Sequence, residues 1–149
     1  MRKKVQSAGV GERLDARLAQ SGLRFTPQRH HVYNVLLKKL DHPTADQVFI
    51  RAKHAMPEIS MATVYNCLDA LVKCELVRQV NVERAATRFC PNMEDHCHFY
   101  CDECGHVFDI NSAGKGRRSA IPLPAGFKAT RFETSIRGTC PECTPKKAA

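Results

Sequence analysis

This chain has no long hydrophobic run, no internal repeat and no low-complexity tract in its 149 residues. No apolar stretch approaches the ~20 residues that a membrane-spanning helix needs. The first residues, MRKKVQS, are basic, but the hydrophobic segment of a secretory signal does not follow them. We therefore expect a cytoplasmic protein that has no membrane partner.

Acidic residues are in short supply, since 15 Asp and Glu stand against 23 Lys and Arg. Residues 1–80 contain 13 basic and 7 acidic residues, whereas residues 81–149 contain 10 and 8. The positive field therefore lies mainly in the first half, and such a field attracts phosphate backbones. The imbalance is equally consistent with double-stranded DNA as a partner and with a merely solvated basic surface.

Disulfides are not expected, although the chain has eight cysteines. The cytosol keeps thiols reduced, which argues against a disulfide scaffold in a protein located there. Close pairs of cysteines with histidines nearby indicate metal binding instead.

The first 90 residues have the pattern of a winged helix-turn-helix DNA-binding domain. Apolar periodicity and capping residues predict four helices, over 11–21, 27–40, 45–54 and 61–74. Thr26, Thr44 and Ser60 are the expected N-caps of the last three. Two strands, over 76–80 and 86–90, complete the plan. Ordinary core-packing helices are the alternative, and the basic charge of this half favours DNA binding over it.

The helix that starts at Ser60 is the predicted recognition helix. Its exposed face carries small, hydroxyl, aromatic and amide side chains together with one acidic residue, namely Ala62, Thr63, Tyr65, Asn66 and Asp69. Side chains of the first four kinds, and Ser60 itself, suit contacts with the DNA backbone and with base edges. Asp69 is expected to lie away from phosphate, because both carry negative charge.

The rest of the chain predicts a second, α/β domain over residues 97–149, after a polar hinge over 91–96. Strands are expected over 96–100, 107–110 and 128–136, with a short helix in the Gly, Lys and Arg segment 113–119. The fold class is therefore α+β, with the DNA-binding domain over residues 1–90.

Two CxxC knuckles, Cys101 with Cys104 and Cys140 with Cys143, are separated by residues 105–139. Each knuckle places two thiolates on one side of a loop, and two knuckles complete a tetrahedral S₄ shell that selects Zn²⁺ and leaves no open position. A redox pair or four buried free cysteines are the alternatives. The spacing predicts a structural zinc ion, which would supply much of the folding free energy of so small a domain.

A second group of candidate ligands includes two histidines that precede the first knuckle. His96 and His98 lie two apart in a predicted strand, so their side chains leave the same face. Asp109 offers an oxygen ligand, Cys90 a thiolate, and His42 lies in the break between two helices. Together these ligand types suit Zn²⁺ or Fe²⁺. For any one histidine the alternative to metal binding is an ordinary surface or core position. We expect such positions for His106 and for two cysteines of the fourth helix, Cys67 and Cys74.

The chain resembles the ferric uptake regulator (Fur) superfamily over about residues 11–143. The matching motifs are GLRFTPQR from Gly22, HPTA from His42, ISMATVY from Ile59, Arg88-Phe89, and His96-Cys97-His98 followed by the two knuckles. The resemblance implies a homodimer built on the C-terminal domain and one structural zinc ion per subunit. It also implies metal-dependent repression at a near-palindromic operator, with the ion closing a site between the two domains.

The same resemblance implies roles for individual residues. It assigns the regulatory site, with one Fe²⁺, Mn²⁺ or Zn²⁺ ion per subunit, to His42, His96, His98 and Asp109. It places Tyr65 and Asn66 in the DNA-contacting helix, and it makes Arg24 a contact of the DNA backbone. The His42-Pro43, Asp95-His96 and Asp109 pattern is most similar to the peroxide-sensing branch, so a peroxide response is expected.

One position departs from that branch. Where the peroxide-sensing branch has an aspartate ligand and the iron-sensing branch a glutamate, this chain has Cys90, which is typical of the zinc uptake regulators. Those regulators draw another ligand from a position that Arg78 matches here, and an arginine cannot bind a metal. We include Cys90 in the regulatory site, and a zinc uptake regulator is the alternative to an iron- or peroxide-responsive one.

Enzymatic readings fit the sequence poorly. A zinc hydrolase or nucleobase deaminase needs an open metal position and a general-base Glu in an H-x-E motif. The motif here is His96-Cys97-His98, and a Cys₄ site is closed, so we expect no catalytic residue and no small-molecule substrate. A zinc-ribbon adaptor would leave the helix-turn-helix half unexplained, and a haem sensor would rest on Cys90-Pro91 alone.

Overall fold

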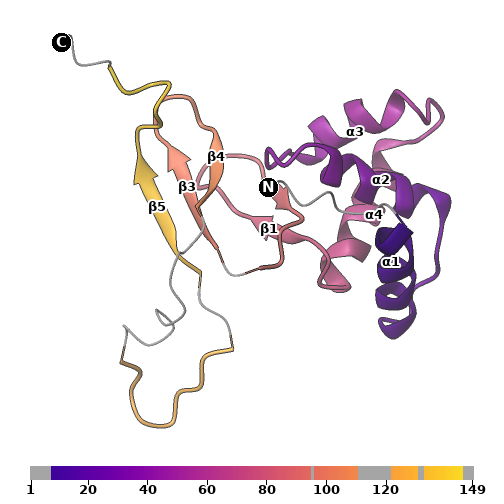
Figure 1. The fold of residues 1–149 in the computed structure, drawn as a ribbon, viewed down its shortest axis with the longest axis horizontal. Helices are drawn as coiled ribbons and strands as arrows, with labels where there is room; N and C mark the ends of the chain where they lie inside the picture. Colours follow the sequence, from indigo (N-terminus) through magenta and orange to yellow (C-terminus); the bar gives the residue numbers. More distant parts are fainter. Residues whose placement is uncertain (1–7, 95, 111–121, 131–132, 146–149) are drawn as a thin grey trace. The chain divides into compact units, whose positions relative to one another are not determined.

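The computed structural model describes residues 8–94, 96–110, 122–130 and 133–145 (Figure 1). The chain divides into two compact units, Met1–Met93 and Glu94–Ala149. The hinge over 91–96 and its movement stay predictions. Within the described residues, no helix combines the length and the apolar character that crossing a membrane requires.

The described residues of the first unit form four helices followed by a two-stranded ribbon (Figure 1). The helices are α1 (Ala8–Gln20), α2 (Pro27–Lys38), α3 (Ala45–Lys53) and α4 (Met61–Lys73). The strands are β1 (Arg78–Val80) and β2 (Arg88–Cys90), which pair antiparallel. This order confirms the predicted helix-turn-helix with a wing. Both strands are shorter than predicted, and the helix ends differ from the predicted ones by a few residues.

Side chains that cap the helices explain where three of them begin. The hydroxyls of Thr26 and Ser60 each accept a hydrogen bond from the backbone N–H three residues later, at 3.2 and 3.1 Å. Thr44 and Gln47 form a reciprocal capping box at the start of α3. These contacts satisfy N–H groups that have no partner inside the helix. The three predicted N-caps are therefore confirmed.

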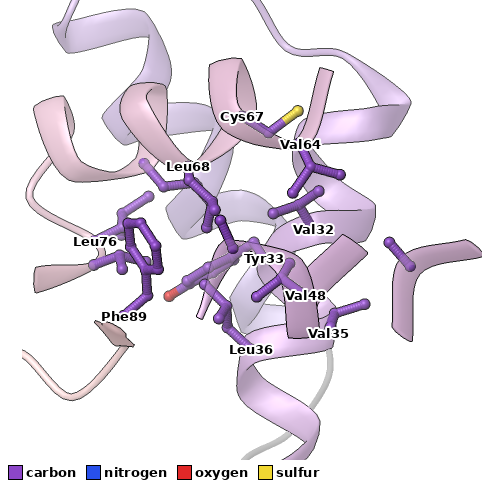
Figure 2. Close-up of a cluster of buried hydrophobic side chains, with 14 of the residues drawn as sticks. Val32, Tyr33, Val35, Leu36, Val48, Val64, Cys67, Leu68, Leu76 and Phe89 are labelled. Carbon is purple, nitrogen blue, oxygen red and sulfur yellow. The ribbon is translucent and has the colours of Figure 1, made fainter. Parts of the chain in front are cut away.

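The core of the first unit is one cluster of apolar side chains from the four helices and the ribbon (Figure 2). Helices α2 and α4 meet through residues spaced three or four apart, which is why Val32, Leu36, Val64 and Leu68 are at most 1% exposed. Phe89 of the ribbon covers one side of the same cluster (Figure 2). Each fully buried side chain of this size stabilises the fold by about 1.5–3 kcal/mol.

The second unit contains a three-stranded sheet in the order β4-β3-β5. Strand β3 (Cys97–Cys101) pairs antiparallel with β4 (Val107–Ile110) and parallel with β5 (Ser135–Gly138). The prediction of a strand over 128–136 is wrong in its bounds, because among the described residues the strand begins at Ser135, opposite His98 near the start of β3, and ends at Gly138. The short helix predicted within 113–119 lies outside the described residues.

Candidate metal centres and DNA-facing helix

Two parallel strands bring the four knuckle cysteines together in the second unit. Cys101 is the last residue of β3, and Gly138, the last residue of β5, lies opposite it. The turn that carries Cys104 and the turn that carries Cys140 and Cys143 therefore leave the same end of the sheet. The four Sγ atoms all lie within 4.8 Å of one another.

The geometry of this cluster suits a tetrahedral ion. Zinc–sulfur bonds of ~2.3 Å require neighbouring sulfurs about 3.8 Å apart, and Cys104 Sγ lies 3.9 Å from Cys140 Sγ. The backbone N–H of Cys140 donates to Cys101 Sγ at 3.3 Å. Gly105 closes the first knuckle with a φ of +70°, which glycine adopts without the strain of a Cβ atom. The donor set and its spacing fit Zn²⁺.

The pKa values of two thiols in the cluster are shifted in opposite directions. Hydrogen bonds from the backbone of Cys104 and Cys140 lower the pKa of the Cys101 thiol to about 6. A hydrogen bond with the Cys140 side chain, followed by burial, raises the pKa of Cys143 to about 12. The protein alone thus favours one thiolate and opposes others. A bound metal ion reverses this, because a coordinating thiol is deprotonated. None of the eight cysteines forms a disulfide.

The second unit also gathers three other ligand atoms on one face of its sheet. His98 of β3 lies opposite Asp109 of β4. His98 Nε2 is 2.9 Å from His96 Nε2 and 3.4 Å from Asp109 Oδ1, and His96 Nε2 is 3.1 Å from the same oxygen. Ligand atoms at 2.0–2.2 Å from a common ion are separated by about 3.0–3.5 Å. The strand alternation predicted from the sequence therefore brings both histidines to the carboxylate.

A backbone contact orients one of these imidazoles. His96 Nδ1 lies 2.6 Å from the carbonyl oxygen of Glu94, to which it donates when its proton is on Nδ1. That tautomer leaves the Nε2 lone pair free for a metal ion, and partners of this kind commonly fix a ligand histidine in place. The sequence did not reveal this contact, because any residue can supply a carbonyl oxygen.

The first unit brings two further candidate ligands together. His42 lies between α2 and α3, and Cys90 is the last residue of β2. The N–H of Phe89 donates to the carbonyl of Pro43 at 3.0 Å, which holds the end of β2 beside the α2–α3 turn. As a result, a ring nitrogen of His42 and the Sγ of Cys90 lie within 4.8 Å of each other. Both residues are at most 3% exposed.

Arg78 has a role other than ligation. It lies directly opposite Cys90 in the β1–β2 ribbon. Its Nη2 donates to the carbonyl of Met93 at 2.6 Å, so the guanidinium ties the segment after Cys90 back to the ribbon. The sequence indicated only that this position could not bind a metal.

Helix α4 presents one polar face to solvent. This face consists of Ala62, Tyr65, Asn66 and Asp69, which are all exposed, and Lys73 in the last turn of the helix is exposed as well. Tyr65 is 49% exposed, although tyrosine has a large apolar ring. In the first turn, the hydroxyls of Ser60 and of the half-buried Thr63 lie 2.9 Å apart, beside a helix N-terminus that attracts phosphate. Arg24 is exposed in the loop between α1 and α2. The face predicted for the recognition helix is thus open to a partner.

The sheet of the second unit has an apolar face that the sequence did not single out. Phe99, Phe108 and Ile136 lie side by side across the three strands, because Phe99 is opposite both of the others. Ile110 continues this face on β4, and together they form what we call the apolar sheet face. Phe108, Ile110 and Ile136 are 36–42% exposed, which is unusual for side chains so close together.

Comparisons with known proteins agree with these observations. Residues 20–136 match the model of the Ferric uptake regulator family. The chain is 34% identical over 131 residues to the peroxide operon regulator of Bacillus subtilis (strain 168), covering 87% of this chain and 90% of that protein. It is 32% identical over 133 residues to the peroxide-responsive repressor PerR of Staphylococcus aureus (strain Mu50), covering 88% and 89%.

Solved structures share the fold at lower sequence identity. The ferric uptake regulator Fur of Helicobacter pylori has a TM-score of 0.73 at 19% identity, with 99% of this chain and 100% of that chain covered. The peroxide stress regulator of Campylobacter jejuni has a TM-score of 0.63 at 22% identity, with 93% and 100% covered. These likenesses show the α+β fold with a winged-helix domain.

Proposed function

We propose that this chain, which belongs to the ferric uptake regulator family, is a metal-dependent transcriptional repressor that binds a near-palindromic operator as a homodimer. The supporting observation is that the chain has two groups of metal-ligand side chains of different chemistry and a winged domain with an exposed helix. Family membership makes the chain a regulator and not an enzyme. We expect it to act in the cytoplasm, where operator DNA is accessible.

The Cys₄ cluster is assigned to a structural zinc ion. Cys101, Cys104, Cys140 and Cys143 would hold it with thiolates alone, and four protein ligands leave no position for a substrate. The ion would join the ends of β3 and β5 and so hold a sheet that has few buried apolar side chains. Its contribution is to folding, not to switching.

The regulatory ion is assigned to five side chains drawn from both units, namely His42, Cys90, His96, His98 and Asp109. Each unit by itself already assembles its share of them. We propose residues 1–90 as the DNA-binding domain, 91–96 as the hinge and 97–149 as the dimerisation domain. A mobile hinge would let the ion select a closed arrangement that fits two operator half-sites. A nearly complete shift needs a ~10⁴-fold preference of the ion for that arrangement.

DNA contacts are assigned to the first turns of α4 and to the loop before α2. Ser60, Ala62, Thr63, Tyr65 and Asn66 would reach the groove, and Arg24 would contact phosphate. Basic side chains of the same unit would add affinity that falls with salt, because binding releases counterions from the duplex.

The apolar sheet face supports a homodimer. Exposed aromatic and aliphatic side chains packed this closely favour burial against another surface. A second copy of the same chain offers an identical face, and two-fold pairing is the commonest way in which such faces are covered. The resulting dimer would present two recognition helices to a near-palindromic operator.

The identity of the regulatory ion decides what the protein senses. The thiolate of Cys90 favours Fe²⁺ or Zn²⁺ over Mn²⁺. With Fe²⁺, the ion supplies redox chemistry, and hydrogen peroxide would transfer one oxygen atom to a ligand histidine or to Cys90 and leave as water. A ligand altered in this way would loosen the site and release the DNA. With redox-inert Zn²⁺ the protein would report zinc supply, and the buried pair of Cys90 with His42 favours this second candidate.

The test is to replace His98 with alanine and measure operator binding by fluorescence anisotropy, with and without added Fe²⁺ or Zn²⁺ under anaerobic conditions. We expect H98A to keep its structural zinc and to lose the ion-dependent gain in DNA affinity. The matched control is H106A, because His106 is an exposed histidine in the same unit and should leave that gain intact. Equal gains in H98A and H106A would contradict the proposal.

Peroxide treatment then separates the two candidate sensors. The iron-loaded protein should lose operator binding and gain the mass of one oxygen atom in a peptide that contains His42, Cys90, His96 or His98. The zinc-loaded protein treated in parallel should keep its binding. If the iron-loaded protein is equally resistant, the zinc-responsive function is the correct one.

A further inference from the structure

We propose that Arg88 is a positioning residue for the metal ligand His42, acting through its backbone. This inference rests on the proposed function, since it takes His42 as a ligand of the regulatory ion. The guanidinium of Arg88 donates a hydrogen bond to the backbone carbonyl oxygen of His42. Its role is to hold the imidazole where the ion will need it.

The backbone of His42 requires such support. Its φ is +52°, in the left-handed region that residues other than glycine rarely occupy. Pro43 follows, and its ring restricts the conformation of the residue before it. A histidine held in this way persists only when neighbouring contacts impose the conformation, and such sites often have a functional role. The contacts made by the α2–α3 turn therefore determine where the ring of His42 lies.

Arg88 makes the contact that links this turn to the second ligand. Its Nη1 donates to the His42 carbonyl at 2.9 Å. The backbone of Arg88 forms an antiparallel bridge with Thr44. The backbone N–H of the next residue, Phe89, donates to the carbonyl oxygen of Pro43 at 3.0 Å. Cys90 comes next on the same strand. Strand β2, Arg88–Cys90, thus ends in the candidate ligand Cys90. The side chain and backbone of Arg88 in the same strand hold the turn that contains His42.

The other side of the turn is held differently. Arg51 makes a bidentate ion pair with Asp41, at 2.8 and 2.7 Å, immediately before His42. Arg51 lies on α3, so this pair ties the turn to the helix that follows it. Arg88, in contrast, ties the turn to the strand that carries Cys90. We therefore expect Arg51 to affect stability and Arg88 to affect the spacing of the two ligands.

Preorganised ligands bind an ion more tightly, because the protein does not have to be ordered when the ion arrives. Residues that orient metal ligands typically change metal affinity by 10- to 100-fold when they are replaced. Arg88 contacts a ligand residue and is itself unable to bind a cation. A loss of affinity in this range, without loss of the structural zinc, is what a positioning role predicts.

The test uses the full chain with its structural zinc in place and Co²⁺ as the probe of the regulatory site. Titration gives the affinity, and the visible and thiolate-to-cobalt absorption bands report the ligand set. We expect R88M to bind Co²⁺ about 10- to 100-fold more weakly, with a weaker thiolate band. R88K should fall between R88M and the native chain, because a flexible ammonium retains one contact but not the fixed fork of a guanidinium.

The matched control is R84M, since Arg84 lies in the exposed turn of the same ribbon and its replacement removes the same charge. R84M should bind Co²⁺ as the native chain does. Thermal unfolding of each variant shows whether it is folded at the titration temperature, and if R88M is not, R88K becomes the deciding variant. Native affinity and spectrum in the folded deciding variant would overturn the inference.

A His42→Ala variant separates this inference from the proposed function. If H42A binds Co²⁺ normally, the assignment of His42 to the site is wrong and the role of Arg88 falls with it. If H42A loses affinity while the Arg88 variants do not, the site stands and only the positioning role is wrong.

Discussion

In the first unit, leucine and valine side chains from all four helices meet in a single buried cluster. In the described residues of the second unit, Tyr100 and Val107 are the only large apolar side chains that are buried, and they are accompanied by Cys101 and Cys140. The first unit can therefore fold through apolar burial. The second has too little of it, so thiolate–metal bonds must supply what the core does not. This contrast predicts that each unit can be unfolded without unfolding the other.

Removal of the structural zinc should have the largest effect. A C104S variant should lose the ion and unfold the second unit, because structural zinc contributes about 10–16 kcal/mol in small zinc domains. The helices of the first unit should remain, as measured by far-UV circular dichroism. C97S is the control, since Cys97 lies on β3 outside the cluster. A C104S protein that keeps its sheet and its zinc would contradict the proposed role of the cluster.

The converse experiment perturbs the core of the first unit. L36A should lower the free energy of unfolding of that unit by about 2–5 kcal/mol, because it leaves a cavity beside α4. The zinc content should not change. L40A provides the matched comparison, since Leu40 is 63% exposed whereas Leu36 is 0% exposed. Chemical denaturation followed with zinc analysis checks both results, and loss of zinc from folded L36A would show that the units are coupled.

Two helix ends within the first unit make a finer comparison. Gly22 follows α1 with a φ of +68°, and Glu75 follows α4 with a φ of +57°. Both helices end with the same pattern of backbone hydrogen bonds. The N–H of Leu23 donates to the carbonyl of Leu18, and the N–H of Leu76 donates to the carbonyl of Leu71. E75G should raise the free energy of unfolding by up to about 1 kcal/mol, and G22A should lower it by a similar amount or more. In thermal unfolding we expect E75G to raise the melting temperature and G22A to lower it. Changes of the same sign in the two variants would contradict this expectation.

The ion pair of Asp41 with Arg51 should have the smallest effect. The Arg51 hydrogen bond lowers the pKa of Asp41, so its stabilisation is present above the unfolded pKa of about 3.9 and is lost as pH falls through the lower folded value. Because a third of the Asp41 side chain is exposed, the pair should contribute no more than about 1 kcal/mol. R51Q should be less stable than the native chain at pH 6, and the difference should disappear in acid. A difference that persists there would have another cause.

Local patterns in the sequence were sufficient to predict the helices and the grouping of the four knuckle cysteines. N-caps such as Thr26 and Ser60 signal a helix start within a few residues, and CxxC spacing determines which cysteines can share an ion. The period of two in a strand likewise predicted that His96 and His98 share a face. The proximity of His98 to Asp109 depends on the register of two strands, which the sequence left open.

Other features depend on the tertiary fold and could not be predicted. The contacts of Arg88 with the carbonyl of His42 and of His96 with the carbonyl of Glu94 both involve backbone oxygens, so they have no sequence signal. The bounds of β5 depend on where β3 ends, not on the composition of residues 128–136. The apolar sheet face was also missed, because Phe99, Phe108 and Ile136 come from three strands that only the topology places side by side.

The most direct test measures metal content and operator binding in the same titration. Protein carrying one zinc per chain should bind the operator weakly, and binding should strengthen in step with the uptake of one further, chelator-removable ion. Withdrawal of that ion alone should reverse the gain while the first zinc remains. Operator binding that stays unchanged across the uptake and removal of the second ion would contradict the division into a structural and a regulatory metal site.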